Sequence, residues 1–237
     1  MTIGILYGIS VGPGDPDLIT VKGVILLQST QVIAFPSGKD DKPGVAQIII
    51  QPWLSQHQTL LPLNFPYVQD ELTLDKAWHK AAESVWNYLS VGQDVAFACE
   101  GDVNFYGTFI YLSQKLLDLH PESLVKAVPG VISPLSAAAS LGIPLAQRQQ
   151  RLAILPALYI LDQLEEYLRH ADTLVLLKVS SVYSQVWQIL KSYNLLKNSY
   201  IVERASQAEE KVYRDLENSR NLKLSYFSLL IVRINPV

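Results

Sequence analysis

The strongest constraint on the fold is the alternation of short, β-branched apolar runs with amphipathic segments. Residues 71–89 carry apolar side chains three or four positions apart with charges on the other face, which predicts a surface helix packed on a sheet. The chain therefore predicts an α/β fold with open, mixed but mostly parallel sheets and helices on both faces. Nine runs are predicted as strands: 3–9, 31–35, 59–63, 94–99, 124–128, 152–155, 173–179, 200–203 and 224–232.

The chain of 237 residues is long enough for two such domains. The polar stretch 147–151 follows the small-residue segment 136–142 and precedes a predicted strand. This composition predicts a boundary near residue 147, with an N-terminal α/β domain over 1–146 and a C-terminal one over 147–237. We expect the active site in the cleft between the two domains.

Composition excludes several classes of function. A net charge of −3 and a pI near 5.8 disfavour a nucleic-acid binder or a protein of anionic membranes. Cys99 is the single cysteine, so neither an intramolecular disulfide nor a zinc site of several thiolates can form. With neither a basic leader nor a long apolar run in the sequence, we expect a cytoplasmic protein.

The first strand leads into a glycine-rich segment, residues 8–16, with the sequence GISVGPGDP. Asp15 is predicted as the N-cap of a helix that begins with Pro16. The segment is not a dinucleotide fingerprint, because the third glycine is missing and Pro13 lacks the N–H that a phosphate would use. A tight strand-to-helix turn without a ligand is the alternative interpretation.

The same segment matches the G-x-S-x-G pattern of serine hydrolases, with Ser10 as the nucleophile. That pattern requires a helix to begin directly after the serine, whereas residues 12–16 delay it. None of the four histidines has a recognisable partner motif, so we disfavour a hydrolase.

A second segment of interest is the acidic turn 100–107 that follows the strand 94–99. Ligands of open α/β sheets bind at the carboxyl ends of the strands. Glu100 and Asp102 are two positions apart, and an extended chain would direct both carboxylates to one side, for acid–base work or a metal. Without a histidine nearby we assign no metal. Alternatively, Asp102 caps the next helix and Glu100 is solvated.

Three later segments also follow predicted strands: 128–134, 177–179 and 202–206. The first leads into the small residues 136–142, which would let a helix approach a neighbour or a flat ligand, although core packing explains them equally well. The other two would face the expected cleft.

Taken in order, these segments resemble the tetrapyrrole methylase family over essentially the whole chain. Among its members, the chain is most similar to those that methylate precorrin-2, or cobalt-factor II, at carbon 20 in cobalamin biosynthesis. The resemblance is carried by YGISVGPGDPDLITVKG, EGDVNFYGTFIYL, VPGVISPLSAAASLGIPLA with RLAILPA, TLVLLKV, VERAS and YFSLLIV.

The resemblance implies S-adenosylmethionine as methyl donor, S-adenosylhomocysteine as its product, a tetrapyrrole substrate and a homodimer. The methylated carbon must then lose a proton to a positioned carboxylate or a water, and Asp102 is the first candidate to accept it. The cofactor contacts that the resemblance implies are Pro13, Gly101, Asp102, Val103, Phe105, Tyr106, Ile132, Ser133, Leu177 and Ala205.

The chain departs from the family pattern at Val103, where a proline is usual, and over residues 64–70. Methylation of another corrinoid or of uroporphyrinogen, and a silent paralogue that only binds, are the alternative functions. Because the implied substrate is a polycarboxylate, some basic residues near the motifs would bind it. These are Lys22, Lys39, Lys42, Arg148, Arg151, Lys178 and Arg204.

Overall fold

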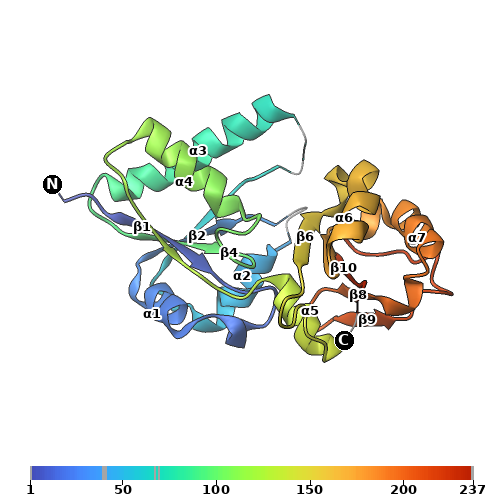
Figure 1. Cartoon of the computed structure of the whole chain (residues 1–237). Helices are drawn as coiled ribbons and strands as arrows, with labels where there is room; N and C mark the ends of the chain where they lie inside the picture. The colour runs from blue at the N-terminus through green and yellow to red at the C-terminus, as the bar shows by residue number, and fades with distance from the viewer. Residues whose placement is uncertain (1, 39–41, 67, 69, 236–237) are drawn as a thin grey trace. The chain divides into compact units, whose positions relative to one another are not determined.

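The computed structural model describes residues 2–38, 42–66, 68 and 70–235. The chain divides into two compact units, Met1–Ile132 and Ser133–Val237, each with its own five-stranded sheet (Figure 1). This confirms the two α/β domains expected from the alternation of strands and helices. No helix in the described part of the chain is long and apolar enough to cross a membrane.

The sheet of the first unit is entirely parallel, with strand order β3-β2-β4-β1-β5. Helix α3 has the bounds predicted from its apolar spacing. The strands are β1 (Ile5–Ser10), β2 (Val32–Pro36), β3 (Thr59–Leu63), β4 (Val95–Cys99) and β5 (Leu124–Val128). The helices are α1 (Val21–Ser29), α2 (Val45–Ile50), α3 (Glu71–Leu89) and α4 (Thr108–Leu119).

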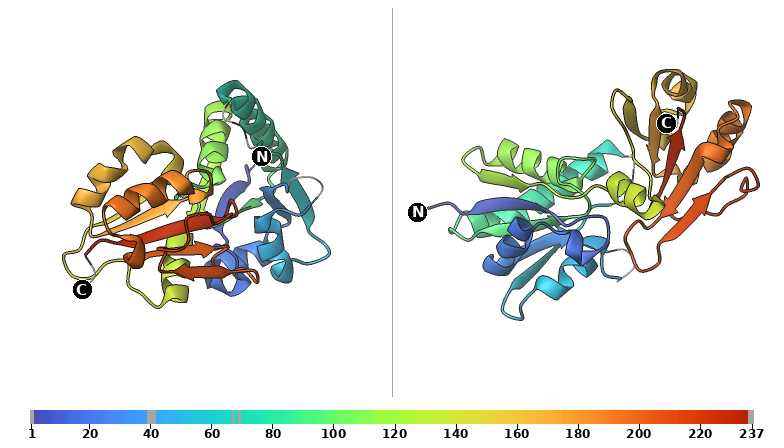
Figure 2. Two further views of the ribbon diagram at one scale, coloured as in Figure 1. Left: turned by 90° about the vertical axis from the view of Figure 1, so that its right-hand side faces the viewer. Right: turned by 60° about the horizontal axis from the view of Figure 1, so that its bottom comes forward.

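Both faces of this sheet are covered, and β4 shows how. Phe97 and Cys99 pack into a cluster with apolar residues of α3 and α4, whereas Ala96 and Ala98 belong to a second cluster with residues of α1 and α2. The alternation follows from the two-residue period of a strand. Figures 1 and 2 show the two helix pairs on opposite faces of the sheet.

The topology brings the turns after β1 and β4 together at the carboxyl ends of the strands. Strands β1 and β4 are parallel neighbours, but the helix after β1 lies on one face and the helix after β4 on the other. Such a reversal is the point at which open α/β sheets bind their ligands, just beyond the carboxyl ends of the strands. Here those ends are Ser10 and Cys99.

The second unit has strand order β6-β7-β10-β8-β9, and only β6 and β7 are parallel. Helices α6 and α7 pack against β7, β8 and β10 around a common apolar core. Its helices are α5 (Ser133–Leu141), α6 (Leu164–His170) and α7 (Tyr183–Ser192). Its strands are β6 (Leu152–Pro156), β7 (Thr173–Leu177), β8 (Ser199–Glu203), β9 (Lys211–Arg214) and β10 (Ser228–Arg233).

Mixed sheets were expected, and the second sheet is mixed: β6 and β7 are parallel, whereas β10 pairs antiparallel with β7 and β8, and β8 with β9. Two details differ from the sequence prediction. The short strand β9 was not predicted, and residues 224–227 precede β10 instead of belonging to it. Helix α5 belongs to the second unit, where Ser140 Oγ donates to Glu210 and Leu141 O accepts from Arg214.

Candidate functional site

The loops that follow β1 and β4 are joined backbone to backbone. Gly101 N donates to Gly12 O at 2.8 Å, and Gly12 N donates to Gly101 O at 3.2 Å. Both glycines have left-handed backbone, with φ of 77° at Gly12 and 71° at Gly101, which side-chain-bearing residues rarely adopt. The bridge therefore fixes the two loops against each other where a ligand of this fold would bind.

Asp102 accepts hydrogen bonds from its own turn and from the loop after β5. Its Oδ2 accepts from Gly130 N, in the loop after β5, at 2.7 Å, and its Oδ1 accepts from Asn104 N at 2.8 Å. The N-cap of α4 is Gly107, so Asp102 does not cap that helix. The left-handed turn at Gly101 also interrupts the extended backbone that would direct Glu100 and Asp102 to one side.

The other residues of the acidic turn divide into buried and open positions. The side chain of Val103 is fully buried in the core, so only its backbone can reach a ligand. Apart from Gly101 and its two chain neighbours, no atom of the described residues lies within 4 Å of the place where a Cβ at Gly101 would stand. Tyr106 is 53% exposed, and its ring lies 4.9 Å from that of Phe105. The turn thus offers open backbone beside two aromatic rings.

The helical segment that follows Asp15 is shorter than predicted. Pro13 is buried, and Asp15 caps a three-residue 3-10 turn, Pro16–Leu18, by accepting from Asp17 N at 2.9 Å. Helix α1 begins only at Val21. The predicted cap is correct, but the loop between β1 and α1 extends further before its helix.

Two of the predicted contacts in the second unit lie at the carboxyl ends of its strands. Leu177 ends β7 and Ala205 follows β8, and both strands run antiparallel to β10, which lies between them. The residues next to them, Lys178 and Arg204, both have left-handed backbone with φ of 55° and 50°. Backbone strain of this kind often accompanies ligand sites. Ser133 lies elsewhere in the unit, as the first residue of α5.

A pocket of about 550 Å³ lies beside the end of β8. On its wall, Glu203 accepts from Ser225 N at 2.6 Å and from the Tyr213 hydroxyl at 2.8 Å. Burial alone would raise the pKa of Glu203, but these two donors and the charge of Lys211 hold that pKa below its ordinary value. The lining residues are Glu203, Arg204, Glu209, Lys211, Lys223, Leu224 and Ser225.

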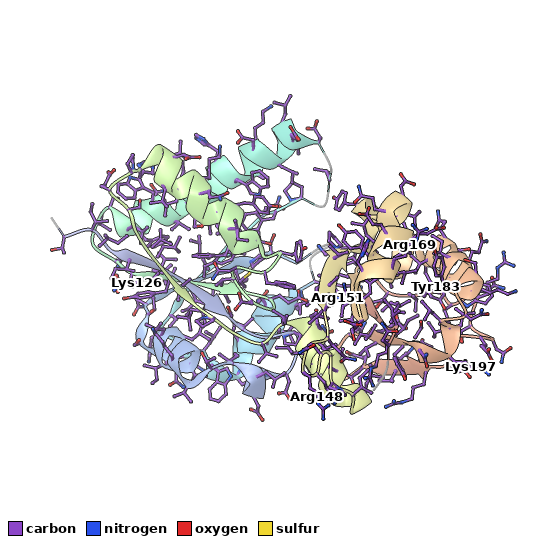
Figure 3. The ribbon with its side chains drawn as sticks, in the orientation of Figure 1. Lys126, Arg148, Arg151, Arg169, Tyr183 and Lys197 are labelled. Carbon is purple, nitrogen blue, oxygen red and sulfur yellow. The ribbon has the colours of Figure 1, made fainter. Side chains whose placement is uncertain are left out.

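The basic residues predicted to meet a polycarboxylate are in different situations. The Nζ of Lys178 lies 5.4 Å from the centre of the Tyr226 ring. Arg151 pairs with Asp172 at 3.5 Å, and Arg148 precedes it in the loop before β6 (Figure 3). Lys39 lies outside the described residues, as do positions 67 and 69 of the departing segment 64–70. Lys211 and Lys223 were not predicted, because neither lies in a recognisable motif.

Two reactive side chains are unsuited to nucleophilic catalysis. Ser10 is fully buried, and its hydroxyl contacts only backbone groups and Asp102 among the described residues. Burial raises the pKa of the Cys99 thiol to about 11, which keeps it protonated at neutral pH. No group of three or more His, Cys, Asp or Glu residues in the described ranges is arranged to hold a metal ion.

Known proteins resemble this chain along almost its entire length. The family model of the Tetrapyrrole (Corrin/Porphyrin) Methylases matches residues 5–219. A cobalt-precorrin-2 C(20)-methyltransferase of Salmonella typhimurium is 30% identical over 230 residues, which cover 97% of this chain and 96% of that protein. A precorrin-2 C(20)-methyltransferase of Sinorhizobium is 29% identical over 239 residues, covering 97% of this chain and 95% of the relative.

A solved structure shows the same fold. The uroporphyrin-III C-methyl transferase of Thermus thermophilus, complexed with S-adenyl homocysteine, matches with a TM-score of 0.66 at 19% identity. The match covers 97% of this chain and 92% of that one. Since the family model spans most of both units and the relatives match nearly end to end, this chain belongs to the tetrapyrrole methylase family.

Proposed function

We propose that this chain transfers a methyl group from S-adenosylmethionine to carbon 20 of precorrin-2 or of its cobalt-containing counterpart, in cobalamin biosynthesis. The reaction and the substrate are those named for the relatives of Salmonella and Sinorhizobium. The structural observation that supports the proposal is the Gly12–Gly101 bridge. It fixes two loops beyond the carboxyl ends of a parallel sheet, where ligands of this fold class bind.

The residues at this edge fit an adenosyl sulfonium ligand. The open backbone at Gly101 lets a ligand approach the chain closely, and the rings of Phe105 and Tyr106 offer apolar surface beside it. We propose that the turn from Gly101 to Tyr106, together with Pro13 and Ile132, contacts the methyl donor. Contacts from Ser133, Leu177 and Ala205 complete the predicted set.

The donor supplies an electrophilic methyl group when bound, so the protein's part is mainly to position it against an electron-rich carbon. Effective molarities of well-oriented reactants are worth roughly 7 to 11 kcal/mol. The chain provides that orientation through the bridged loops after β1 and β4 and the loop after β5, which Asp102 ties to them. A carboxylate or a water would accept the proton that the methylated carbon loses, and Asp102 is the side chain that we test for this.

The pocket of the second unit fits part of a substrate rich in carboxylates. Lys211 and Lys223 both line it, and neither lies within 4.0 Å of a carboxylate oxygen of the described residues. We propose that they bind peripheral carboxylates of the macrocycle as point charges. The homodimer implied by the resemblance is also part of the proposal, and sedimentation of the purified chain tests it.

The first experiment is a calorimetric titration of the purified chain with S-adenosylhomocysteine. The proposal predicts saturable binding of one molecule per chain. If neither this ligand nor S-adenosylmethionine binds, alone or with the tetrapyrrole present, the proposal fails and a silent paralogue becomes the better account.

A further inference from the structure

The hydroxyl of Ser10 is buried and engaged in hydrogen bonds, as suits a structural role and not a nucleophile. It is the last residue of β1 and is completely buried. Its hydrogen is directed to Val128 O at 2.7 Å, with Asp102 Oδ2 as a longer acceptor at 3.3 Å. Its oxygen in turn accepts from Val103 N at 2.9 Å. One hydroxyl therefore satisfies backbone groups of two other chain segments.

These contacts join the ends of three neighbouring strands. Ser10 ends β1, Val103 follows β4, and Val128 ends β5, where β1 is the middle strand of the three. Asp102 closes the arrangement by accepting from Gly130 N at 2.7 Å. The network holds the acidic turn and the loop after β5 at a set separation.

We infer that Ser10 is a positioning residue, whose hydroxyl sets the spacing between the turn 101–104 and the loop 128–131. This inference rests on the proposed function, which assigns both segments to the methyl donor. The physical reason is the buried N–H of Val103: without the serine oxygen it would lose its acceptor, and the turn would shift to recover one.

Gly130 fits this role, because it leaves room for the serine. A Cβ at position 130 would lie 2.4 Å from Ser10 Cβ, closer than such atoms approach, and 3.3 Å from Ser10 O. A side chain at position 130 must therefore push the loop after β5 away from β1. The two positions are coupled sterically as well as through Asp102.

The test compares Ser10→Ala with Ser199→Ala in the full chain, with S-adenosylhomocysteine as the probe. Ser199 is as buried as Ser10 and also donates to a backbone carbonyl, Leu195 O at 2.8 Å, but in the second unit and away from the predicted contacts. We expect Ser10→Ala to raise the dissociation constant by about tenfold. Ser199→Ala should lower the melting temperature and leave that constant unchanged.

A double-variant cycle tests the coupling with Gly130. Gly130→Ala should weaken S-adenosylhomocysteine binding in the native background. In the Ser10→Gly background the same change should weaken binding less, because the colliding Cβ is gone. Independent, multiplicative effects of the two changes contradict a spacing role for Ser10.

A measurement on the unaltered chain covers the case in which Ser10→Ala does not fold. The Val103 amide should be protected from hydrogen exchange in the free protein, because it donates to a buried oxygen. An unprotected Val103 amide, or a folded Ser10→Ala with native affinity, overturns the inference. Absence of binding by the unaltered chain instead contradicts the proposed function, so the two failures are distinguishable.

Discussion

The hydroxyl of Tyr213 on β9 donates a 2.8 Å hydrogen bond to the buried carboxylate of Glu203 at the end of β8. The other carboxylate oxygen accepts from Ser225 N at 2.6 Å. Three chain segments around the pocket are thus held by one acidic side chain. The arrangement links the stability of the second unit to the ionisation of Glu203.

The first prediction concerns acid stability. The pKa of Glu203 is lower in the folded chain than in the unfolded one, so its stabilisation is present above the unfolded value and is lost as pH falls through the folded value. Glu203→Gln should therefore be less stable than the native chain at pH 7, and the difference should shrink below about pH 4. Denaturant unfolding at the two pH values measures this. A difference that does not change with pH would contradict it.

The second prediction concerns the charges at the pocket. Lys211→Glu combined with Lys223→Glu should raise KM for the tetrapyrrole about tenfold, with a smaller effect on kcat, because only binding of the carboxylates is lost. The native KM should also rise with salt, and less so in the variant. Lys76→Glu combined with Lys80→Glu, two exposed positions on α3, changes the net charge equally and is the control. Equal KM values in all three proteins would remove the pocket from substrate binding.

The third prediction separates two roles of Asp102. Asp102→Ala should slow methyl transfer more than about tenfold. The affinity for S-adenosylhomocysteine should fall as well, because Gly130 N and Asn104 N lose their acceptor. If affinity is native while the rate is reduced, the role is proton acceptance instead of positioning. A native rate would exclude both roles.

The fourth prediction concerns alkaline stability. The Tyr183 hydroxyl donates to Ser219 O at 2.8 Å, and burial raises the pKa of Tyr183 from 10.0 to about 12. Its stabilisation is complete below pH 10 and is lost as pH rises towards 12. Tyr183→Phe should cost about 1 kcal/mol at pH 7, and its stability should fall less steeply above pH 10. Urea unfolding measures both, with exposed Tyr159→Phe as control.

Most of the fold could be predicted, because local patterns determine it. The apolar spacing of 71–89 coincides with α3, and each predicted strand has a counterpart. Strand β9 escaped prediction because KVYR is short and mostly exposed, so it carries little apolar signal. The direction of individual strands was not predicted for another reason. Whether β8 pairs parallel or antiparallel depends on tertiary partners, which composition does not encode.

The candidate site was predictable as segments but not as contacts. The sequence placed glycines and carboxylates at strand ends, whereas the Gly12–Gly101 bridge joins residues far apart in the chain. The environment of Ser10 likewise depends on β4 and β5 lying on either side of β1. In the sequence this serine matched a hydrolase pattern and lay within a family motif, and neither assigned it a hydrogen-bonding role. Long-range pairing turned it into a buried hydrogen-bonding residue.

The most direct test of the central claim is a single-turnover reaction. The purified chain is mixed with precorrin-2, or with cobalt-factor II, and S-adenosylmethionine carrying a ¹³C-labelled methyl group. Mass spectrometry and NMR then count and locate the label. The account predicts one labelled methyl group, on carbon 20 of the macrocycle. Label on a different carbon, or no transfer by a chain that binds the methyl donor, would contradict it.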